Sequence, residues 1–301
     1  MGSTMNIIDL FSQNKLIQDW QAHVSQLERQ LIMGLSGSSR ALAIASAYQA
    51  NKGKYVVITS TQNEVEKLAS DLSSLIGEEQ VYTFFADDVA AAEFIFSSMD
   101  KVNSRLESLN FLQNAEQTGV LVTSLMGTRV LLPNPATYAH NQLHFELGHS
   151  YELDDVVKTL ALLGYQRANQ VLNPGEFSQR GDIIDIYEIT ADRPYRLEFF
   201  GDEIDGIRQF EVSSQKSVDT LSHVTIFPAD DLLLYEEDFA RATKSLEKYL
   251  ETAKEEQHAY LSEVYESTKA GYKHADIRRF ASIFYAKEWT LLDYIPKETP
   301  V

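Results

Sequence analysis

The sequence contains no cysteine and few residues that interrupt regular structure, with 14 glycines and 7 prolines in 301 residues. Without cysteine the chain can form neither a disulfide framework nor a thiolate metal site, which suits a cytoplasmic protein. No apolar run approaches the roughly 20 residues that cross a bilayer. We therefore expect a soluble, cytoplasmic protein with no membrane role.

Basic residues are also scarce, since 26 lysines and arginines stand against 44 acidic residues and give a formal charge of −18. A chain of this charge is repelled by phosphate backbones unless a local basic patch intervenes, so strong DNA binding is not expected. The hydrophobic content of 44% is that of a globular protein, and the length fits two or three domains.

The first part of the chain, from Gln30 to about Leu132, alternates short apolar segments with helical patterns, which is typical of a parallel α/β sheet. A helix is predicted over 62–76, because apolar residues recur there every three or four positions and Thr61 is a suitable N-cap. The expected strands are Gln30–Met33, Tyr55–Thr59, Val81–Phe85 and Val120–Thr123.

Pro133 and Pro135 mark a boundary, after which the pattern changes to one helix followed by strands with glycine and proline turns. This predicts an antiparallel α+β unit, and a helical stretch follows from Glu236 to about Tyr272. The strands expected in this unit are Gln166–Val171, Phe177–Tyr187, Tyr195–Phe200, Ile204–Val212 and Val224–Phe227.

The segment from Gly34 to Ala41 stands where a phosphate-binding loop would join the first strand to a helix. Compared with GxxxxGK[ST], Gly34 fits, whereas Ser39 replaces the second glycine, Arg40 the lysine and Ala41 the hydroxyl residue. Gly37 lies within the loop. Without the lysine and the Mg²⁺ ligand we expect no ATPase activity, although weak anion binding by Arg40 stays open.

Two motifs in the second unit carry a resemblance to a known family. They are Gly175-Glu176-Phe177-Ser178-Gln179-Arg180-Gly181-Asp182-Ile183-Ile184-Asp185-Ile186-Tyr187 and Tyr195-Arg196-Leu197-Glu198-Phe199-Phe200-Gly201-Asp202-Glu203-Ile204-Asp205. Together they resemble domain 2 of UvrB and of the transcription-repair coupling factors. The segment Leu291–Pro296 is similar to the one before the Walker B region of UvrB. Because Phe84–Ser98 lacks the tyrosine-rich DNA hairpin of UvrB, the coupling factors are the better match.

The resemblance implies a degenerate RecA/helicase-like domain over 5–140, residues 1–4 being set aside as a cloning remnant. It implies an inserted α+β domain like UvrB domain 2 over 145–228, and a helical segment over 229–301 that returns to the first domain. The fragment would recruit UvrA by mimicking UvrB, with no cofactor. In the full-length protein other domains would contact RNA polymerase and DNA and act as an ATP-dependent translocase.

The family's UvrA-binding surface lies on the domain 2 sheet, and UvrB has a second arginine at the position of Ser178. The residues implied for UvrA binding are Arg167, Glu176, Phe177, Arg180, Asp182, Asp185, Arg196 and Glu198, with Arg196 as a candidate to replace the missing arginine. The ordinary alternatives are a surface salt bridge from Arg180 to Glu198 or Asp182, and a core position for Phe177. Of Phe199 and Phe200, which alternate faces, one is expected in the core.

Other chemistry has little support. His140 and His144 stand four residues apart near Glu146 and His149, but Leu143–Leu147 reads as a strand, so a solvated linker is expected rather than a metal site. No GxSxG nucleophile motif occurs, and a hydrolase is unsupported. The remaining alternatives are a nucleotide-dependent repair protein of the UvrB type and a DNA-binding module.

Overall fold

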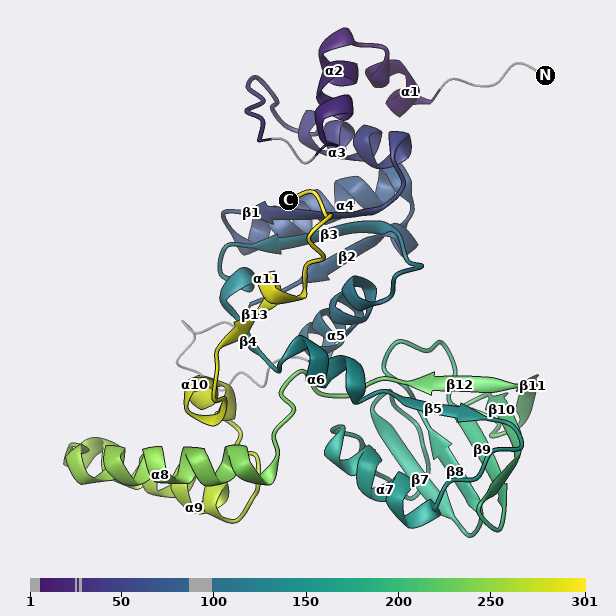
Figure 1. Ribbon diagram of the computed structural model, residues 1–301, viewed down its shortest axis with the longest axis vertical. Coiled ribbons are helices and arrows are strands. Elements are labelled where there is room, and N and C mark those ends of the chain that lie inside the picture. Colours follow the sequence, from purple (N-terminus) through teal and green to yellow (C-terminus); the bar gives the residue numbers. More distant parts are fainter. Residues whose placement is uncertain (1–5, 25, 27–28, 87–98) are drawn as a thin grey trace. The chain divides into compact units, whose positions relative to one another are not determined.

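The computed structural model describes residues 6–24, 26, 29–86 and 99–301, and its contacts divide the chain into two units. The first unit comprises the described residues up to Val130 together with Thr290–Val301, and the second comprises Leu131–Trp289. Figure 1 labels the elements of both units. The division into three domains expected from the sequence stays a prediction.

The first unit contains a parallel sheet in the order β1-β3-β2, with β3 in the middle and buried along its whole length. Strand order of this kind requires crossover helices, and α4 and α5 supply them. Its elements are α1 (Ile7–Ser12), α2 (Lys15–Val24), α3 (Ser39–Ala50), β1 (Lys54–Thr59), α4 (Gln62–Ile76), η1 (Glu78–Gln80), β2 (Val81–Phe84), α5 (Met99–Gln113), β3 (Gly119–Ser124), η2 (Gly127–Arg129) and α11 (Leu291–Tyr294).

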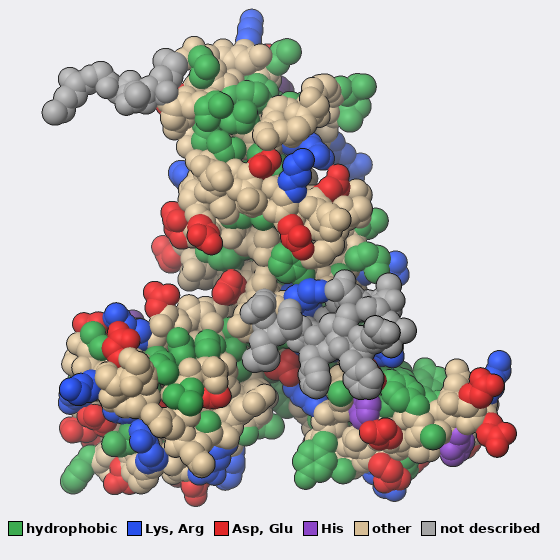
Figure 2. Space-filling model, turned by 180° about the vertical axis from the view of Figure 1, so that it is seen from behind, with side chains coloured by type: hydrophobic (Ala, Val, Ile, Leu, Met, Phe, Trp, Pro, Cys, Tyr) green, Lys and Arg blue, Asp and Glu red, His purple; other side chains and the backbone are tan. Residues whose placement is uncertain are grey.

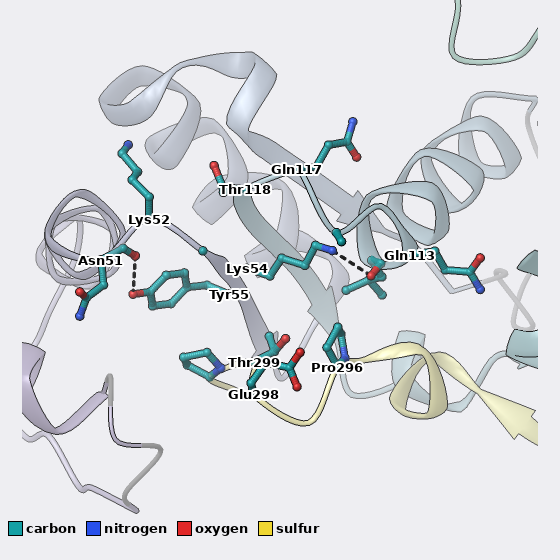
Figure 3. Close-up of a pocket in the computed structure, with 14 residues that line it drawn as sticks. Asn51, Lys52, Lys54, Tyr55, Gln113, Gln117, Thr118, Pro296, Glu298 and Thr299 are labelled. Atoms are coloured by element: carbon teal, nitrogen blue, oxygen red, sulfur yellow. Dashed lines mark hydrogen bonds between the residues drawn. The ribbon is translucent and has the colours of Figure 1, made fainter. Parts of the chain in front are cut away.

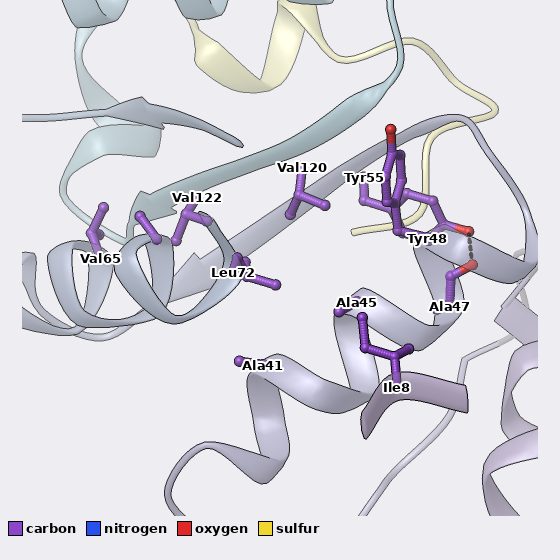
Figure 4. Close-up of a cluster of buried hydrophobic side chains, with 11 residues drawn as sticks. Ile8, Ala41, Ala45, Ala47, Tyr48, Tyr55, Val65, Leu72, Val120 and Val122 are labelled. Carbon is purple, nitrogen blue, oxygen red and sulfur yellow. Dashed lines mark hydrogen bonds between the residues drawn. The ribbon is translucent and has the colours of Figure 1, made fainter. Parts of the chain in front are cut away.

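The core of the first unit forms where α3 and α4 meet the sheet. Val65, Ala69 and Leu72 recur along the buried stripe of α4, and they join residues of α3, β1 and β3 in one apolar cluster (Figure 4). The predicted limits of α4 are confirmed. The Thr61 hydroxyl accepts a hydrogen bond from the backbone N–H of Glu64 at its start, and Gly77 ends it with a φ of 99°.

The prediction of a strand at Gln30–Met33 is wrong, because these residues have no regular structure and Leu31 and Met33 are exposed. A strand requires a neighbour for its backbone hydrogen bonds. At the outer edge of β1 the N–H of Val56 donates instead to the carbonyl of Pro300, at 2.9 Å. An apolar run of three residues does not fix a strand when the nearby sheet edge pairs with another segment.

The second unit contains a six-stranded sheet in the order β11-β10-β9-β8-β7-β6, antiparallel except for β6 and β7. Its strands are β6 (Gln166–Arg167), β7 (Glu176–Arg180), β8 (Ile183–Ile186), β9 (Tyr195–Phe200), β10 (Glu203–Phe210) and β11 (Ser217–Leu221). The expected continuous strand Phe177–Tyr187 is a hairpin, because Gly181 has a φ of 60° and reverses the chain. The strand expected at Gln166–Val171 stops at Arg167, and β11 was not predicted.

Further elements complete the second unit. A small antiparallel pair is formed by β5 (Leu143–Glu146) and β12 (His223–Ile226), and α7 (Leu153–Leu162) leads into the large sheet. The helices α8 (Glu236–Thr252) and α9 (Glu255–Lys269) account for the helical stretch that the sequence predicts. The remaining short elements are β4 (Leu131–Leu132), α6 (Pro135–His140), η3 (Ile277–Phe280), α10 (Ala281–Phe284) and β13 (Trp289–Thr290).

One face of the large sheet is apolar, because alternate residues of its strands are buried there. The buried set is Phe177, Ile184, Ile186, Leu197, Phe199, Ile204 and Ile207. The predicted mixture of a parallel α/β sheet and an antiparallel α+β sheet is therefore present. No helix among the described residues is long and apolar enough to cross a membrane.

Replacing Leu72 by alanine should lower the free energy of unfolding of the first unit by about 2–5 kcal/mol, because the substitution leaves a cavity at a fully buried position. Urea unfolding would measure the loss. The matched control is Glu66→Ala on the exposed side of the same helix, for which we expect a change within about 0.5 kcal/mol. Equal effects of the two substitutions would contradict the packing described for α4.

Candidate partner-binding surface

The polar face of the large sheet is organised by one buried carboxylate, that of Asp185. The strand register places Asp185 opposite Ser178 on β7 and opposite Arg196 on β9. Only 1% of the Asp185 side chain is exposed. Its Oδ1 accepts from Arg196 Nε at 2.7 Å, while its Oδ2 accepts from Arg196 Nη2 at 3.0 Å and from Arg180 Nη2 at 2.6 Å. The charge that burial would penalise is therefore paired and hydrogen-bonded.

Arg196 is held from several sides and is 13% exposed. Its guanidinium carbon lies 4.5 Å from the centre of the Phe210 ring, and its Nη1 donates to the backbone carbonyl of Gln215 at 3.2 Å. The hydrogen bonds to Asp185 raise the pKa of Arg196 above its already high value, against the opposing effect of burial. Arg196 therefore acts as a fixed part of the sheet face.

Arg180 differs from Arg196 because half of its side chain is exposed. One Nη2 contact to Asp185 fixes the direction of the guanidinium, which has five N–H donors in all. Since Arg196 already neutralises Asp185, Arg180 brings a positive charge to the surface. The salt bridge considered from the sequence, to Glu198 or Asp182, is replaced by this contact to Asp185.

Glu198 lies on the same face as Arg180 and pairs with a residue that was not predicted, Arg208 on β10. Arg208 Nε lies 3.3 Å from Glu198 Oε2, and both side chains are partly exposed. Arg208 stands directly opposite Arg196 in the register, an arrangement of like charges that is unfavourable without counter-ions. Asp185 and Glu198 supply one carboxylate for each of these two arginines.

The other residues implied for binding lie elsewhere. Phe177 is 1% exposed and belongs to the apolar face, and Asp182 is exposed in the β7–β8 turn. Arg167 donates to the Gln179 side chain at 3.2 Å, and its register partner is Phe177. Because Phe177 and Gln179 alternate with Arg180, Arg167 and Arg180 lie on opposite faces near the β6 edge.

Glu176 stabilises the turn before β7. Its carboxylate accepts from the backbone N–H groups of Leu172 and Asn173, at 2.8 and 3.0 Å, and from the Asn173 side chain at 2.9 Å. Burial raises the pKa of Glu176, but these hydrogen bonds outweigh burial and the net direction is downward. The Glu176 carboxylate is therefore engaged in hydrogen bonds that stabilise this turn.

Arg208 and Phe200 are two exposed residues of this face that were not predicted to belong to the site. Phe199 is 7% exposed and Phe200 84%, so the expected alternation is confirmed with Phe199 in the core. The alternation of side chains along β10 also places Arg208 on this face, opposite Arg196. Assigning Arg208 to the face requires the strand register.

In the segment compared with a phosphate loop, the helix expected after Ala41 is present but begins earlier, at Ser39, and Gly34 and Gly37 have positive φ angles. Ala41 is fully buried, and Arg40 Nη1 lies 3.9 Å from Glu64 Oε1. Hydrogen bonds from Ser60 lower the pKa of Glu64, and Arg40 acts in the same direction. The residue in place of the lysine therefore faces a carboxylate. Residues 87–98 of the stretch compared with the UvrB hairpin lie outside the described residues.

A pocket of about 610 Å³ opens at the amino-terminal end of β1, between the end of α5 and residues 296–300 (Figure 3). Lys54 donates to the backbone carbonyls of Leu112 and Asn114, at 3.0 and 2.7 Å. Burial lowers the pKa of Lys54, and Glu298 opposes this effect. These bonds direct the ammonium group toward the protein backbone.

His144 and His149 have local partners. His140 lies in α6 and His144 in β5, so their spacing does not place them on one helix face, as expected. His144 contacts the Thr225 hydroxyl, and His149 lies 3.0 Å from Glu146. The described part of the chain contains no group of three or more potential metal ligands.

Comparisons with known proteins place the polar face within a recognised domain. Residues 143–232 match the family model described as the UvrB interaction domain, and this range contains every residue of the Asp185 network. Residues 143–232 of the second unit therefore resemble the UvrB interaction domain.

Most of the chain also resembles one kind of curated protein. It is 32% identical over 282 residues to the transcription-repair-coupling factor of Bacillus subtilis (strain 168), covering 91% of this chain and 24% of that protein. The counterpart from Staphylococcus aureus (strain bovine RF122 / ET3-1) is 30% identical over 280 residues, covering 89% and 24%. The chain is thus homologous to transcription-repair-coupling factors, and it spans about a quarter of their length. The resemblance stated from the sequence is confirmed.

Removing the Asp185 carboxylate should destabilise the second unit strongly, because Arg196 would stay buried without its counter-ion. For Asp185→Ala we expect a loss of about 3–5 kcal/mol in the free energy of unfolding. The matched control is Asp182→Ala in the adjoining turn, an exposed position where the change should stay within about 0.5 kcal/mol. Urea unfolding of both variants would show whether Asp185 holds the face together.

Proposed function

We propose that this chain is a non-catalytic module of a transcription-coupled repair factor that recruits UvrA by mimicking UvrB. The observation that carries the proposal is the UvrB interaction domain over residues 143–232, whose sheet presents a pre-oriented and half-exposed Arg180. Arginine is enriched at the energetic centres of protein interfaces. A fixed guanidinium also loses little conformational freedom when it binds.

Arg180 is the principal residue of the proposed docking face, and the other arginines have different places in the sheet. Arg196 is hydrogen-bonded to Asp185, which lies opposite Ser178, so Arg196 supports the face rather than extending from it. Arg167 lies around the β6 edge on the opposite side of the sheet. A partner that contacts both Arg180 and Arg167 has to enclose that edge. We therefore rank Arg180 above Arg167, with Glu198 as an acidic contact beside it.

The finer architecture is also part of the proposal. The parallel-sheet unit is a degenerate RecA/helicase-like domain over 5–140, and the antiparallel unit is a domain like UvrB domain 2 over 145–228. The segment 229–301 is helical and returns to the first domain. In the full-length protein we expect ATP-dependent DNA translocation and contacts with RNA polymerase in other domains, and a cytoplasmic location.

A nucleotide-dependent repair protein of the UvrB type is the alternative. The buried Ala41 has no hydroxyl to hold Mg²⁺, and Arg40 faces Glu64 instead of an open anion site. Thermal stabilisation of the chain by ATP and Mg²⁺ would favour this alternative. On the face drawn in Figure 2, acidic and basic side chains are interspersed, and no continuous basic area is visible for a DNA-binding module.

The test is calorimetric titration of this chain with purified UvrA. We expect binding by the unmutated chain and a loss of about 2 kcal/mol or more for Arg180→Ala, the size typical of an interface hot spot. For Arg167→Ala we expect a smaller loss. Arg193→Ala is the matched control, since Arg193 lies in the same unit and pairs with Glu211. No binding by the unmutated chain would contradict the proposed function.

A further inference from the structure

Phe200 is an apolar side chain exposed on the polar face of the large sheet. It ends β9 two residues after Glu198, so the two side chains share a face, and the register pairs it with Glu203 across a two-residue turn. Its exposed fraction of 84% contrasts with the 7% of Phe199 on the other face. No packing requirement within the described residues explains a phenylalanine at this position.

Arg208 is the second unassigned feature of the same face. Its ion pair with Glu198 joins Nε to Oε2, and 44% of the Arg208 side chain is exposed. Gly206 lies directly opposite Glu198, and a Cβ at this position would lie 2.7 Å from Glu198 Oε2. The absence of a side chain at Gly206 leaves room for the Glu198 carboxylate to reach Arg208. The sheet therefore accommodates the ion pair between Glu198 and Arg208.

These positions continue the face on which Arg180 lies. Arg180 is opposite Ile183, Ile183 is opposite Glu198, and Glu198 is opposite Gly206, so one cross-strand row joins β7 to β10. Phe200 lies beyond this row at the turn, and Arg208 lies on the other side of it. Figure 1 shows β7, β8, β9 and β10 side by side in this sheet.

We propose that the docking face extends from Arg180 across the sheet to Arg208 and Phe200. Its occupant is a protein surface with an apolar pocket for the Phe200 ring and carboxylates that meet the two arginines. This inference rests on the proposed function and specifies the chemistry of the partner's surface. An aromatic side chain is the typical anchor of a protein interface, and bidentate pairing with carboxylates is what guanidinium groups favour.

The positive charge of the exposed arginines and the position of Phe200 on the same face both favour this occupant. Arg196 is neutralised by Asp185 and is largely buried, so the arginines that extend from the face are Arg180 and Arg208. Burial of a ring that is 84% exposed removes apolar surface from water, which favours association. Phe200 thus takes the anchoring task that the sequence assigned to Phe177, which is buried in the core.

The experiment measures UvrA affinity for Phe200→Ala and Arg208→Ala by calorimetry, beside the unmutated chain and Arg180→Ala. We expect Kd to rise about 30-fold or more for Phe200→Ala and about 5- to 30-fold for Arg208→Ala. Leu162→Ala is the apolar control, at an exposed position of α7, and Arg193→Ala is the charged control. Both controls should bind within about twofold of the unmutated chain.

Two further measurements separate the possible outcomes. Urea unfolding should leave Phe200→Ala as stable as the unmutated chain, so a lost affinity is not a folding defect. Arg208→Lys keeps the charge and removes the planar fork, and it should recover only part of the affinity. Unchanged affinity in Phe200→Ala and Arg208→Ala, with loss in Arg180→Ala, would overturn this inference and leave the proposed function standing. No binding by the unmutated chain would instead remove the proposed function itself.

Discussion

The polar face of the large sheet depends on the carboxylate of Asp185, which two arginines share. A carboxylate as buried as this one is costly unless its charge and its lone pairs are matched, and Arg196 matches both through two hydrogen bonds. Arg180 then needs only one contact to the same group. The hydrogen bond to Asp185 fixes the direction of the exposed Arg180 guanidinium. The positive charge of Arg180 is not neutralised by this contact, because Arg196 already balances the charge of Asp185.

The two faces of this sheet have separate tasks that follow from the alternation of side chains. Phe177, Ile184 and Leu197 are buried on one face and hold the unit together. Ser178, Asp185 and Arg196 occupy the other face, where the polar network replaces apolar packing. The apolar packing on one face and the paired charges on the other together stabilise this sheet.

In the first unit, the segment compared with a phosphate loop leads into a helix, while its side chains make contacts within the unit. Helix α3 begins where a nucleotide-binding helix would begin, but Ala41 contributes to the apolar cluster rather than to a metal site. Arg40 faces Glu64, a residue of the following helix α4. Both side chains are therefore engaged within the first unit.

The elements with local signals could be predicted from the sequence alone. The apolar spacing of α4, its Thr61 cap and the motifs around Arg180 and Arg196 were sufficient for the helix limits, the two kinds of sheet and the family resemblance. The prediction of a strand at Gln30–Met33 failed because a strand forms only beside a hydrogen-bonded neighbour, and the local sequence does not reveal whether that neighbour is present. The face on which each site residue lies was also beyond the sequence, since a shift of register by one residue exchanges the two faces. The fold was needed to show that Phe177 is a core residue, that Arg167 and Arg180 lie on opposite faces, and that the buried Asp185 carboxylate accepts a hydrogen bond from Arg180.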